Sequence, residues 1–435
     1  MTSATAAAAR RPGAPDARRV ALEVLRRVES DGAYVNLAAP AVLARSGLDR
    51  RDRDFATGLV YGVTRMRRAC DFLVDRFLLR PVEAPVRSVL RLGAYQLHHL
   101  QTPAHAAVHA TVACAPMRAR GLVNAVLRRV ADAGGDVAWP DDATRLSYPD
   151  WVLARLVADL GRHEAIGALV AMNEPAEGLE RPDGYVQDRA SQWVAEAVDV
   201  RPGERVADVC AGPGGKATAL VGAGATVTAG DVRPARAGLV RDNGRRLGVD
   251  GRLHVVVADG RRPPLRAGGF DRVLVDAPCS GLGALRRRPD ARWRVTPDSV
   301  DRLAALQRAL LDAAVCLLRP GGTLVYSVCT MTTAETASVD EHVVARHRAL
   351  VPLGELSAPW RRRGRGSIVL PQDAATDGMA LYRYRLAPRR GTVDPMNGIP
   401  NRREPAAPVG LVGPVRAAHS PAGPEPRSIE GGDGP

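Results

Sequence analysis

The stretch Leu324-Val325-Tyr326-Ser327-Val328-Cys329-Thr330 has the pattern of a buried strand that ends at a thiol. Valine, tyrosine and threonine favour a pleated strand, and Pro320 to Gly322 just before it predict a turn. The stretch Arg272-Val273-Leu274-Val275-Asp276-Ala277-Pro278-Cys279 repeats the pattern earlier in the chain. Open α/β sheets bind their ligands outside the carboxyl ends of the strands. If the two strands are neighbours, both thiols face one cleft, and Cys329 becomes a candidate catalytic residue. The alternative is a core role for both thiols, since free cysteine is often buried.

The length and composition favour a two-domain protein without membrane spans. A chain of 435 residues can hold two domains, each with a sizeable core. No apolar run approaches the length of a membrane span, and Arg10-Arg11-Pro12 interrupt the alanine-rich N-terminus, which therefore lacks the pattern of a signal peptide. The six cysteines form no C-x-x-C pair and no zinc spacing with histidine, so we expect no metal site and no disulfide framework. This usage fits a reducing cytoplasm.

The net charge of +14 points to a polyanionic partner, and nucleic acid is the commonest of these. Lys216 is the only lysine, so arginine supplies all but one of the 61 basic residues. Such usage also fits a general compositional bias. The planar guanidinium of arginine nevertheless suits phosphate recognition.

The first part of the chain, from Arg18 to about Leu160, has a helical pattern throughout. Apolar residues recur every three or four positions and predict one apolar face over about six turns: Phe55, Leu59, Val63, Met66, Cys70, Leu73 and Phe77. Cys70 is expected in the core. Up to Asp150 there are 22 arginines and 15 acidic residues, so the basic surplus is 22 − 15 = 7. A solvated helix surface explains such a surplus, and so does an RNA-binding surface.

Four phrases in this part, in the same order, resemble the NusB-like RNA-binding domain: Arg51-Asp52-Arg53-Asp54-Phe55, Leu59-Val60-Tyr61-Gly62-Val63, Leu90-Arg91-Leu92-Gly93-Ala94-Tyr95-Gln96-Leu97 and Gly121-Leu122-Val123-Asn124-Ala125-Val126-Leu127-Arg128-Arg129. The resemblance implies an all-α domain that binds RNA.

The second part alternates strands with helices, which predicts a parallel α/β sheet of the Rossmann-like kind. A helical pair, Trp151 to Met172, and a short polar link, Ala176 to Gly184, come before it. The expected strands are 205–211, 226–231, 253–259, 270–277 and 323–329, with closing strands at 367–370 and 378–386. The predicted division of the chain is a disordered N-terminus (1–17), a NusB-like domain (18–150), a helical linker (151–184), a catalytic domain (185–386) and a disordered tail (387–435).

A glycine-rich loop, Asp208-Val209-Cys210-Ala211-Gly212-Pro213-Gly214-Gly215-Lys216, follows the first of these strands. Glycines let the backbone approach a ligand closely, and the helix N-terminus behind them favours negative charge. A P-loop fails at both ends, because position 210 is Cys and position 217 is Ala. A dinucleotide fingerprint, G-x-G-x-x-A, matches at Gly212, Gly214 and Ala217. The third alternative is S-adenosylmethionine.

Acidic residues near the ends of the first four strands favour methyl transfer over hydride transfer. Asp231 ends the second strand and is placed to accept hydrogen bonds from both ribose hydroxyls, and Asp259 ends the third and is suited to the adenine amino group. Asp208 lies within the first strand, and Asp276 near the end of the fourth. Each aspartate alone is commonly a helix cap or a turn residue, but four in sheet order favour a cofactor site.

The two strand-end thiols suit the chemistry of cytosine methylation. Carbon 6 of cytosine can take a thiolate, and the adduct makes carbon 5 nucleophilic toward a methyl sulfonium. This reaction needs a cysteine, an acid to protonate the ring nitrogen and a nearby methyl donor, and Cys329 and Asp276 near the glycine-rich loop supply these groups. The thiol must become a thiolate in the site, and the base must leave its stack. A dehydrogenase would have no use for two such thiols.

Four motifs resemble those of the RsmB/Sun family of S-adenosylmethionine-dependent RNA 5-methylcytosine methyltransferases, which pair a NusB-like domain with this catalytic domain: 210–216, Asp276-Ala277-Pro278-Cys279-Ser280-Gly281, Arg288-Pro289-Asp290-Ala291-Arg292-Trp293 and 326–330. The resemblance covers about residues 18–386. It implies Cys329 as nucleophile, Cys279 in release of the methylated RNA, and 16S ribosomal RNA as substrate. It also implies cofactor contacts from Cys210, Ala211, Gly212, Pro213, Gly214, Gly215, Lys216, Asp231, Asp259 and Asp276.

Two features differ from the family pattern. Gly212 stands where the family usually has alanine, and only eleven residues separate Pro175 from Gln187, where members usually carry a longer substrate-facing segment. The target RNA therefore stays open between ribosomal RNA and another RNA such as tRNA. A non-catalytic RNA-binding regulator is the alternative from another class. We expect a cytoplasmic monomer that binds RNA and S-adenosylmethionine, without membrane or metal.

Overall fold

The computed structural model describes residues 16–176 and 178–388. The segments expected to be disordered, 1–17 and 387–435, lie outside this range except for residues 16, 17, 387 and 388. Over the described range, no helix is long and apolar enough to cross a membrane.

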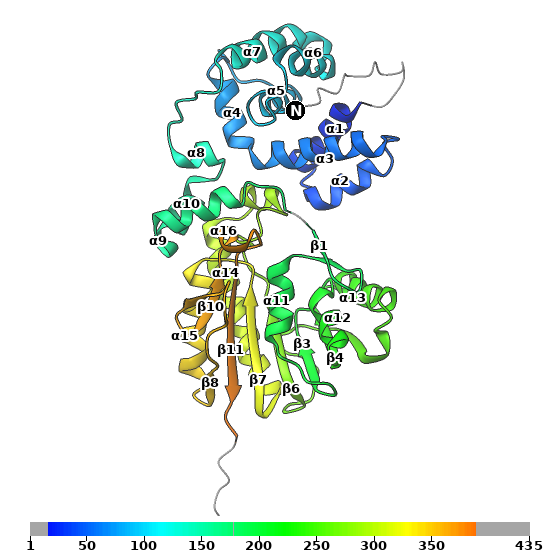
Figure 1. The fold of residues 1–435 in the computed structure, drawn as a ribbon, viewed down its shortest axis with the longest axis vertical. Coiled ribbons are helices and arrows are strands. Elements are labelled where there is room, and N and C mark those ends of the chain that lie inside the picture. The colour runs from blue at the N-terminus through cyan, green and yellow to red at the C-terminus, as the bar shows by residue number, and fades with distance from the viewer. Residues whose placement is uncertain (1–15, 177, 389–435) are drawn as a thin grey trace, which may run out of the picture. The chain divides into compact units, whose positions relative to one another are not determined.

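The first 171 residues fold as helices wherever the structure describes regular elements, which confirms the predicted all-α part (Figure 1). Asp16 and Asp49 begin the first and third helices, because their carboxylates accept hydrogen bonds from free backbone N–H groups of the first turn. Cys70 is fully buried in the helical core, as expected. The helices are α1 (Ala17–Glu29), α2 (Val35–Leu43), α3 (Arg50–Arg65), α4 (Arg67–Asp75), α5 (Ala84–His98), α6 (Ala104–Cys114), α7 (Arg120–Asp132), α8 (Asp142–Leu146), α9 (Asp150–Leu160) and α10 (Arg162–Ala171).

The prediction of one continuous apolar face from Phe55 to Phe77 is wrong at Met66. Its backbone leaves the helical region (φ −94°, ψ 24°), and α3 ends where α4 begins. The Ser147 hydroxyl accepts the backbone N–H of Arg68 at 3.0 Å and so caps α4. At the other side of the break, the carbonyl of Thr64 accepts the indole N–H of Trp293 at 2.8 Å. Contacts with distant residues therefore stabilise a break that the apolar spacing does not reveal.

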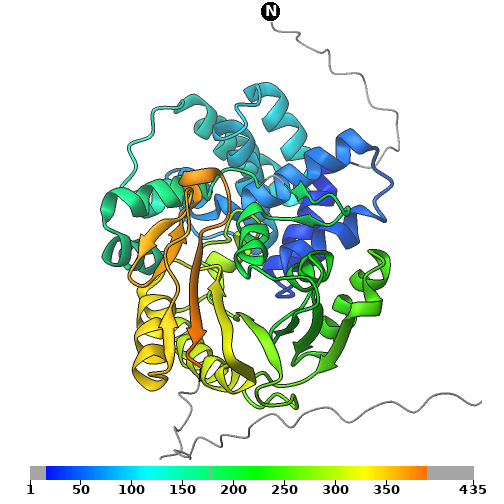
Figure 2. The same ribbon diagram turned by 60° about the horizontal axis from the view of Figure 1, so that its bottom comes forward.

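The second part of the chain builds a nine-stranded mixed sheet (Figures 1 and 2). Five strands are parallel, as predicted, and their order in the sheet is β5-β4-β3-β6-β7. β11 joins β7 antiparallel. The strands are β3 (Arg205–Asp208), β4 (Thr226–Asp231), β5 (Leu253–Val257), β6 (Phe270–Asp276), β7 (Leu318–Val328), β8 (Leu350–Pro352), β9 (Arg361–Arg363), β10 (Gly366–Val369) and β11 (Met379–Leu386).

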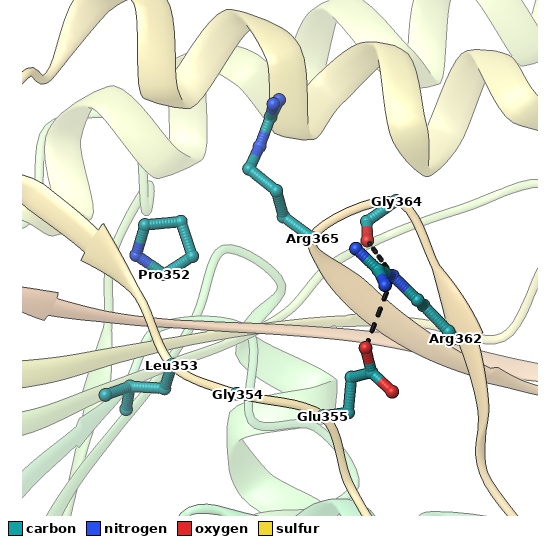
Figure 3. A pocket seen from close by; sticks show the side chains of 7 residues that line it. All are labelled: Pro352, Leu353, Gly354, Glu355, Arg362, Gly364 and Arg365. Atoms are coloured by element: carbon teal, nitrogen blue, oxygen red, sulfur yellow. Dashed lines mark hydrogen bonds and ion pairs between the residues drawn. The ribbon is translucent and has the colours of Figure 1, made fainter.

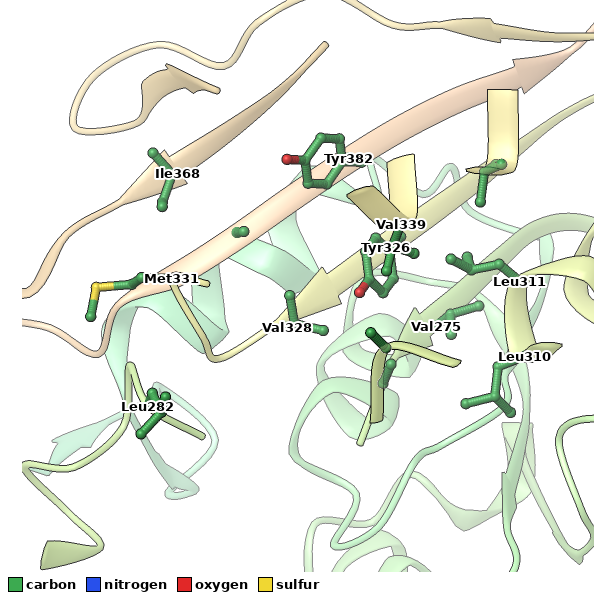
Figure 4. Close-up of a cluster of buried hydrophobic side chains, with 14 of the residues drawn as sticks. Val275, Leu282, Leu310, Leu311, Tyr326, Val328, Met331, Val339, Ile368 and Tyr382 are labelled. Atoms are coloured by element: carbon green, nitrogen blue, oxygen red, sulfur yellow. The ribbon is translucent and has the colours of Figure 1, made fainter. Parts of the chain in front are cut away.

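Helices cover both faces of this sheet. Side chains of β6 and β7 alternate between two apolar clusters, because successive residues of a strand point to opposite faces. On one face Tyr326 and Val328 of β7 and Val275 of β6 pack with Leu310 and Leu311 (Figure 4). The helices of this face are α14 (Pro297–Leu317) and α15 (Ala337–Arg346), and α9 and α10 contribute to the same cluster. The other face packs on α11 (Arg189–Ala197), α12 (Gly215–Gly222) and α13 (Pro234–Arg246).

Three details differ from the prediction. β7 begins at Leu318, so Pro320 to Gly322 form an irregularity within the strand instead of a turn before it. The predicted polar link contains half of a small antiparallel hairpin, β1 (Leu179–Glu180) and β2 (Val186–Gln187). β8 and β9 were not predicted, because strands of three residues show no periodicity. The short helix α16 (Pro371–Ala374) precedes β11.

Candidate active site

The two predicted thiols lie side by side, because β6 and β7 are parallel neighbours. Asp276 pairs in register with Ser327. Cys279 comes three residues after Asp276, and Cys329 comes two residues after Ser327, so both thiols lie just beyond the same edge of the sheet. Their sulfur atoms are 3.3 Å apart, and both side chains keep some exposure to solvent. Figure 4 shows the apolar residues Val328 and Met331, which flank Cys329 in the chain, at this end of β7. The expectation that the two strands are neighbours is confirmed, and the two thiols at their ends are in contact.

The contact between the thiols makes them chemically unequal. The hydrogen bond from Cys279 outweighs burial and the charges of Asp276 and Asp377, and it lowers the pKa of the Cys329 thiol. The same hydrogen bond, together with burial and the charges of Cys329 and Glu335, raises the pKa of the Cys279 thiol well above its ordinary value. Cys329 is therefore the thiol that ionises first. A thiolate is the nucleophilic form of cysteine.

Asp276 lies at the carboxyl end of β6 and is held on both carboxylate oxygens. Oδ1 accepts the hydroxyl of Ser327 at 2.6 Å, and Oδ2 pairs with Nζ of Lys216 at 2.6 Å. Burial lowers the pKa of Lys216, but the neighbouring Asp276 outweighs it and the net pKa is raised. The only lysine of the chain is thus a fixed cation that links the glycine-rich loop to the strand carrying Cys279.

The glycine-rich loop connects β3 to α12, as predicted. Asp208 ends β3, residues 209–214 connect the strand to the helix, and Gly215 and Lys216 begin the helix. A Cβ on Gly212 would lie 2.6 Å from Oδ2 of Asp231 and 2.8 Å from the side chain of Arg236. Glycine at this position lets Arg236 bond to both Asp231 and the carbonyl of Gly212. This contact is a physical reason for glycine where the family pattern has alanine.

The two other predicted cofactor residues differ in their surroundings. Asp231 is buried beside the loop, where it accepts the backbone N–H of Gly212 at 3.2 Å and the Nε of Arg236 at 3.0 Å. Asp259 is partly exposed, and its carboxylate pairs with Arg261, two residues along the chain. The structure therefore brings Asp231 together with the loop. Among the contacts of the described residues, none joins Asp259 to the rest of the site.

Asp208, at the end of β3, is a buried carboxylate without a well-formed hydrogen bond. The side chain is 1% exposed, and neither oxygen has a hydrogen-bond partner. Burial, and after it the charge of Asp276, raise the pKa of Asp208 to about 7, although the nearby cation of Lys216 opposes this. A carboxylate directly after the buried apolar residues Val206 and Ala207 is the sequence signal for such a site. Its lone position beside the loop fits a cationic or hydrogen-bonding ligand group.

Replacing Asp208 with asparagine is expected to change the pH dependence of stability. The folded-state pKa of about 7 lies above the unfolded value near 3.9, so the folded protein binds an extra proton between them. The free energy of unfolding therefore falls as the pH rises through this window and levels off above it. Asp208→Asn should remove this fall, worth on the order of 4 kcal/mol over the whole window and about 2.6 kcal/mol between pH 5 and pH 8. Urea unfolding of ligand-free protein at pH 5 and pH 8 measures the difference.

The exposed Asp242 of α13 provides the matched control, and Asp242→Asn should leave the pH dependence of the parent protein in place. Equal pH dependence in Asp208→Asn and the parent protein would contradict a raised pKa of the Asp208 carboxyl in the folded state.

Two loops cross beside the backbone of Cys329. The backbone N–H of Gly283 donates to the carbonyl of Cys329 at 3.0 Å, and the N–H of Gly378 donates to the carbonyl of Gly283 at 2.8 Å. A Cβ on Gly283 would lie 2.1 Å from the Gly378 carbonyl oxygen, so only glycine fits this crossing. Arg287 pairs with the fully buried Asp377 in the same loops. The sequence pattern does not reveal these residues, because their positions depend on contacts between distant segments.

A hollow of about 280 Å³ lies elsewhere, near β8 and β9 (Figure 3). Arg362 crosses it and pairs with Glu355 at 3.2 Å. Its lining contains no residue of the candidate site: Pro352, Leu353, Gly354, Glu355, Arg362, Gly364 and Arg365. Arg365 pairs with Asp340 at 3.0 Å, so the charges around this hollow are largely matched. It is a poorer candidate than the thiol pair.

Comparison with known proteins identifies both parts of the chain. Residues 195–384 match the family described as 16S rRNA methyltransferase RsmB/F, and residues 15–132 match the NusB family. A Mycobacterium tuberculosis protein named as a methyltransferase is 39% identical over 419 residues, covering 80% of this chain and 90% of that protein. The ribosomal RNA small subunit methyltransferase B of Thermus thermophilus is 37% identical over 410 residues, covering 86% of this chain and 98% of that protein.

The fold also has a counterpart among solved structures. The crystal structure of PH0851 covers 87% of this chain and 99% of its own chain with a TM-score of 0.69, at 19% identity. The matching residue ranges agree with the helical part and the α/β part described above. The chain therefore belongs to the RsmB/F family of S-adenosylmethionine-dependent RNA methyltransferases.

Proposed function

We propose that this protein forms 5-methylcytosine in 16S ribosomal RNA through a covalent bond between Cys329 and the target cytosine. The observation that carries the proposal is the pair of thiols 3.3 Å apart at the ends of two neighbouring strands. The relatives named for the small ribosomal subunit support 16S RNA as substrate. We place the activity in the cytoplasm, on a monomeric protein.

The residues around the glycine-rich loop fit S-adenosylmethionine. Asp231 offers acceptors for the ribose hydroxyls, and the buried carboxylate of Asp208 suits a cationic group. The backbone of residues 210–214 and of the first residues of α12 can approach the cofactor closely. Asp276 supplies a further acceptor, and Asp259 supplies another once its pairing with Arg261 is broken. Bound there, the cofactor supplies an electrophilic methyl group on a sulfonium.

The protein's own residues then act on the base. The Cys329 thiolate adds to carbon 6 while the protonated form of Asp276 gives a proton to the ring nitrogen. Carbon 5 becomes nucleophilic and takes the methyl group as the bond between that group and the sulfonium sulfur breaks. A base removes the proton from carbon 5. The electrons of that C–H bond restore the ring double bond, Cys329 leaves as thiolate, and the ring nitrogen returns its proton to Asp276. Cys279 provides the neighbouring thiol that assists this departure. The target cytosine must leave its stack to reach Cys329.

Bisulfite sequencing of RNA from cells with and without the protein tests the proposal. A cytosine in 16S ribosomal RNA should be protected from conversion only when the protein is present. Protection in a tRNA instead would favour the alternative substrate. That alternative stands because the segment that contains the hairpin 179–187 is shorter than the substrate-facing segment usual in the family. No protected cytosine in any RNA would contradict cytosine-5 chemistry. Calorimetry that detects no S-adenosylmethionine binding would favour a non-catalytic RNA-binding regulator.

A further inference from the structure

Glu335 is a buried carboxylate that accepts five hydrogen bonds. It lies in the short 3-10 turn that follows the Cys329 strand and is 0% exposed. Oε1 accepts the backbone N–H of Ser280 at 2.7 Å and Nε2 of Gln307 at 3.2 Å. Oε2 accepts the hydroxyls of Ser280 at 2.6 Å, Thr332 at 2.9 Å and Thr330 at 3.1 Å. All five partners donate, which suits a carboxylate that only accepts.

These donors belong to both thiol-bearing segments. Ser280 directly follows Cys279, and Thr330 directly follows Cys329. One carboxylate therefore joins the residue after each thiol, and the Ser280 and Thr330 hydroxyls also contact each other at 3.0 Å. Buried charge-assisted hydrogen bonds of this kind are strong and geometrically demanding.

Two core residues, Tyr326 and Gln307, hold Glu335 in place. The Tyr326 hydroxyl donates to the backbone carbonyl of Glu335 at 2.6 Å and lies 3.0 Å from Oε1 of Gln307. Nε2 of Gln307 also donates to the carbonyl of Pro278 at 2.9 Å, directly before Cys279. The segment that carries Cys279 is thus held at Pro278 and at Ser280, on both sides of the thiol. Tyr326 of β7 and Gln307 of α14 in turn hold Glu335 in place.

The charge of Glu335 also acts on the Cys279 thiol. It is among the causes that raise the pKa of Cys279, after the hydrogen bond with Cys329 and burial. The other charged groups that act on Cys329 come from different segments: Asp276 at the end of β6, Asp377 in the loop before β11, and Arg288. Lys216 and Arg287 are cations that interact with the Cys329 sulfur.

We propose that Glu335 is the positioning residue of this site: by holding the residues directly after Cys279 and Cys329 it fixes the spacing of the two thiols, so that Cys329 is the nucleophile. The inference rests on the proposed cytosine-5 function, but its thiol chemistry can be measured without RNA. Glu335 itself touches neither the substrate nor the cofactor in this account.

The test compares Glu335→Gln with Glu341→Gln, an exposed glutamate on α15, in the full-length protein. Alkylation by iodoacetamide is followed across pH, and peptide mass spectrometry reads each cysteine separately. In the parent protein and in Glu341→Gln, Cys329 should react at lower pH than Cys279. In Glu335→Gln the two profiles should converge. Single-turnover methylation should slow about 10- to 100-fold, the range expected for a small misplacement of reacting groups. The dissociation constant for S-adenosylmethionine should stay within about twofold.

Unchanged alkylation profiles and an unchanged single-turnover rate in Glu335→Gln would overturn the inference, provided that the parent protein methylates RNA. A parent protein that methylates no cytosine would instead contradict the proposed function, and the alkylation profiles would still decide the role of Glu335. If Glu335→Gln does not fold, as judged by circular dichroism, Ser280→Ala removes one donor and decides the inference by the same two measurements. Convergent profiles and slower transfer would support it, and parent-like values would overturn it.

Discussion

Replacing Cys329 with alanine is expected to abolish methyl transfer while RNA binding stays intact. No other thiol can form the bond to carbon 6 in its place, because the neighbouring Cys279 is held as the protonated partner at 3.3 Å. Removal of a nucleophile typically costs a factor on the order of 10³ or more in turnover. Transfer of a labelled methyl group from S-adenosylmethionine to 16S ribosomal RNA measures the loss, and an electrophoretic mobility shift measures RNA binding.

Cys316 supplies the matched control for this substitution. Its thiol is exposed on α14, outside the candidate site, so Cys316→Ala should transfer methyl groups at the parent rate. Residual turnover of Cys329→Ala above about one per cent of the parent rate would place the nucleophile elsewhere. Loss of RNA binding in Cys329→Ala would show that the substitution disturbs more than the chemistry.

Replacing Cys279 with alanine is expected to trap the protein on its RNA. Cys329 can still add to the cytosine, although more slowly without the hydrogen bond that lowers the pKa of its thiol, and the methyl group can still transfer, because neither step forms a bond to the second thiol. Departure of Cys329 should slow, since the thiol that donates a hydrogen bond to its sulfur is gone. A covalent protein–RNA adduct should therefore appear as a slowly migrating band on a denaturing gel with labelled RNA.

The double substitution Cys279→Ala with Cys329→Ala is the control, because it should give no such band. If Cys279→Ala yields only free RNA at a normal methylation rate, the role of Cys279 is limited to packing. A band that persists in the double variant would mean that a different residue bonds to the RNA.

The sequence predicted the pairing of the thiols because that pairing depends on few assumptions. Two apolar stretches of strand length end in cysteine, and parallel strands place their carboxyl ends at the same edge of the sheet. The glycine-rich loop and Asp231 follow from the same rule, since β3 and β4 are also neighbours. Local pattern and sheet topology were sufficient for this part of the site.

The remaining features depend on contacts between distant residues. Glu335 lies six residues after Cys329, yet its role comes from Ser280, which only the β6–β7 pairing brings near. The break at Met66 occurs within an unbroken apolar pattern, and Ser147 and Trp293 stabilise it from far along the chain. For Asp259 the competing partner is local. Arg261, two residues further along the chain, binds the Asp259 carboxylate. The rule that ligands bind at strand ends does not predict such a local ion pair.

Mapping the covalent bond on the unaltered protein tests the central claim most directly. 16S ribosomal RNA containing 5-fluorocytidine should trap the adduct with S-adenosylmethionine present, because a carbon 5 that bears fluorine has no proton to lose. Tandem mass spectrometry after digestion then identifies the modified peptide, since Arg286 and several other arginines separate the two thiols. The account predicts the nucleotide on Cys329. A nucleotide on Cys279, or no covalent adduct from RNA that the protein otherwise methylates, would contradict it.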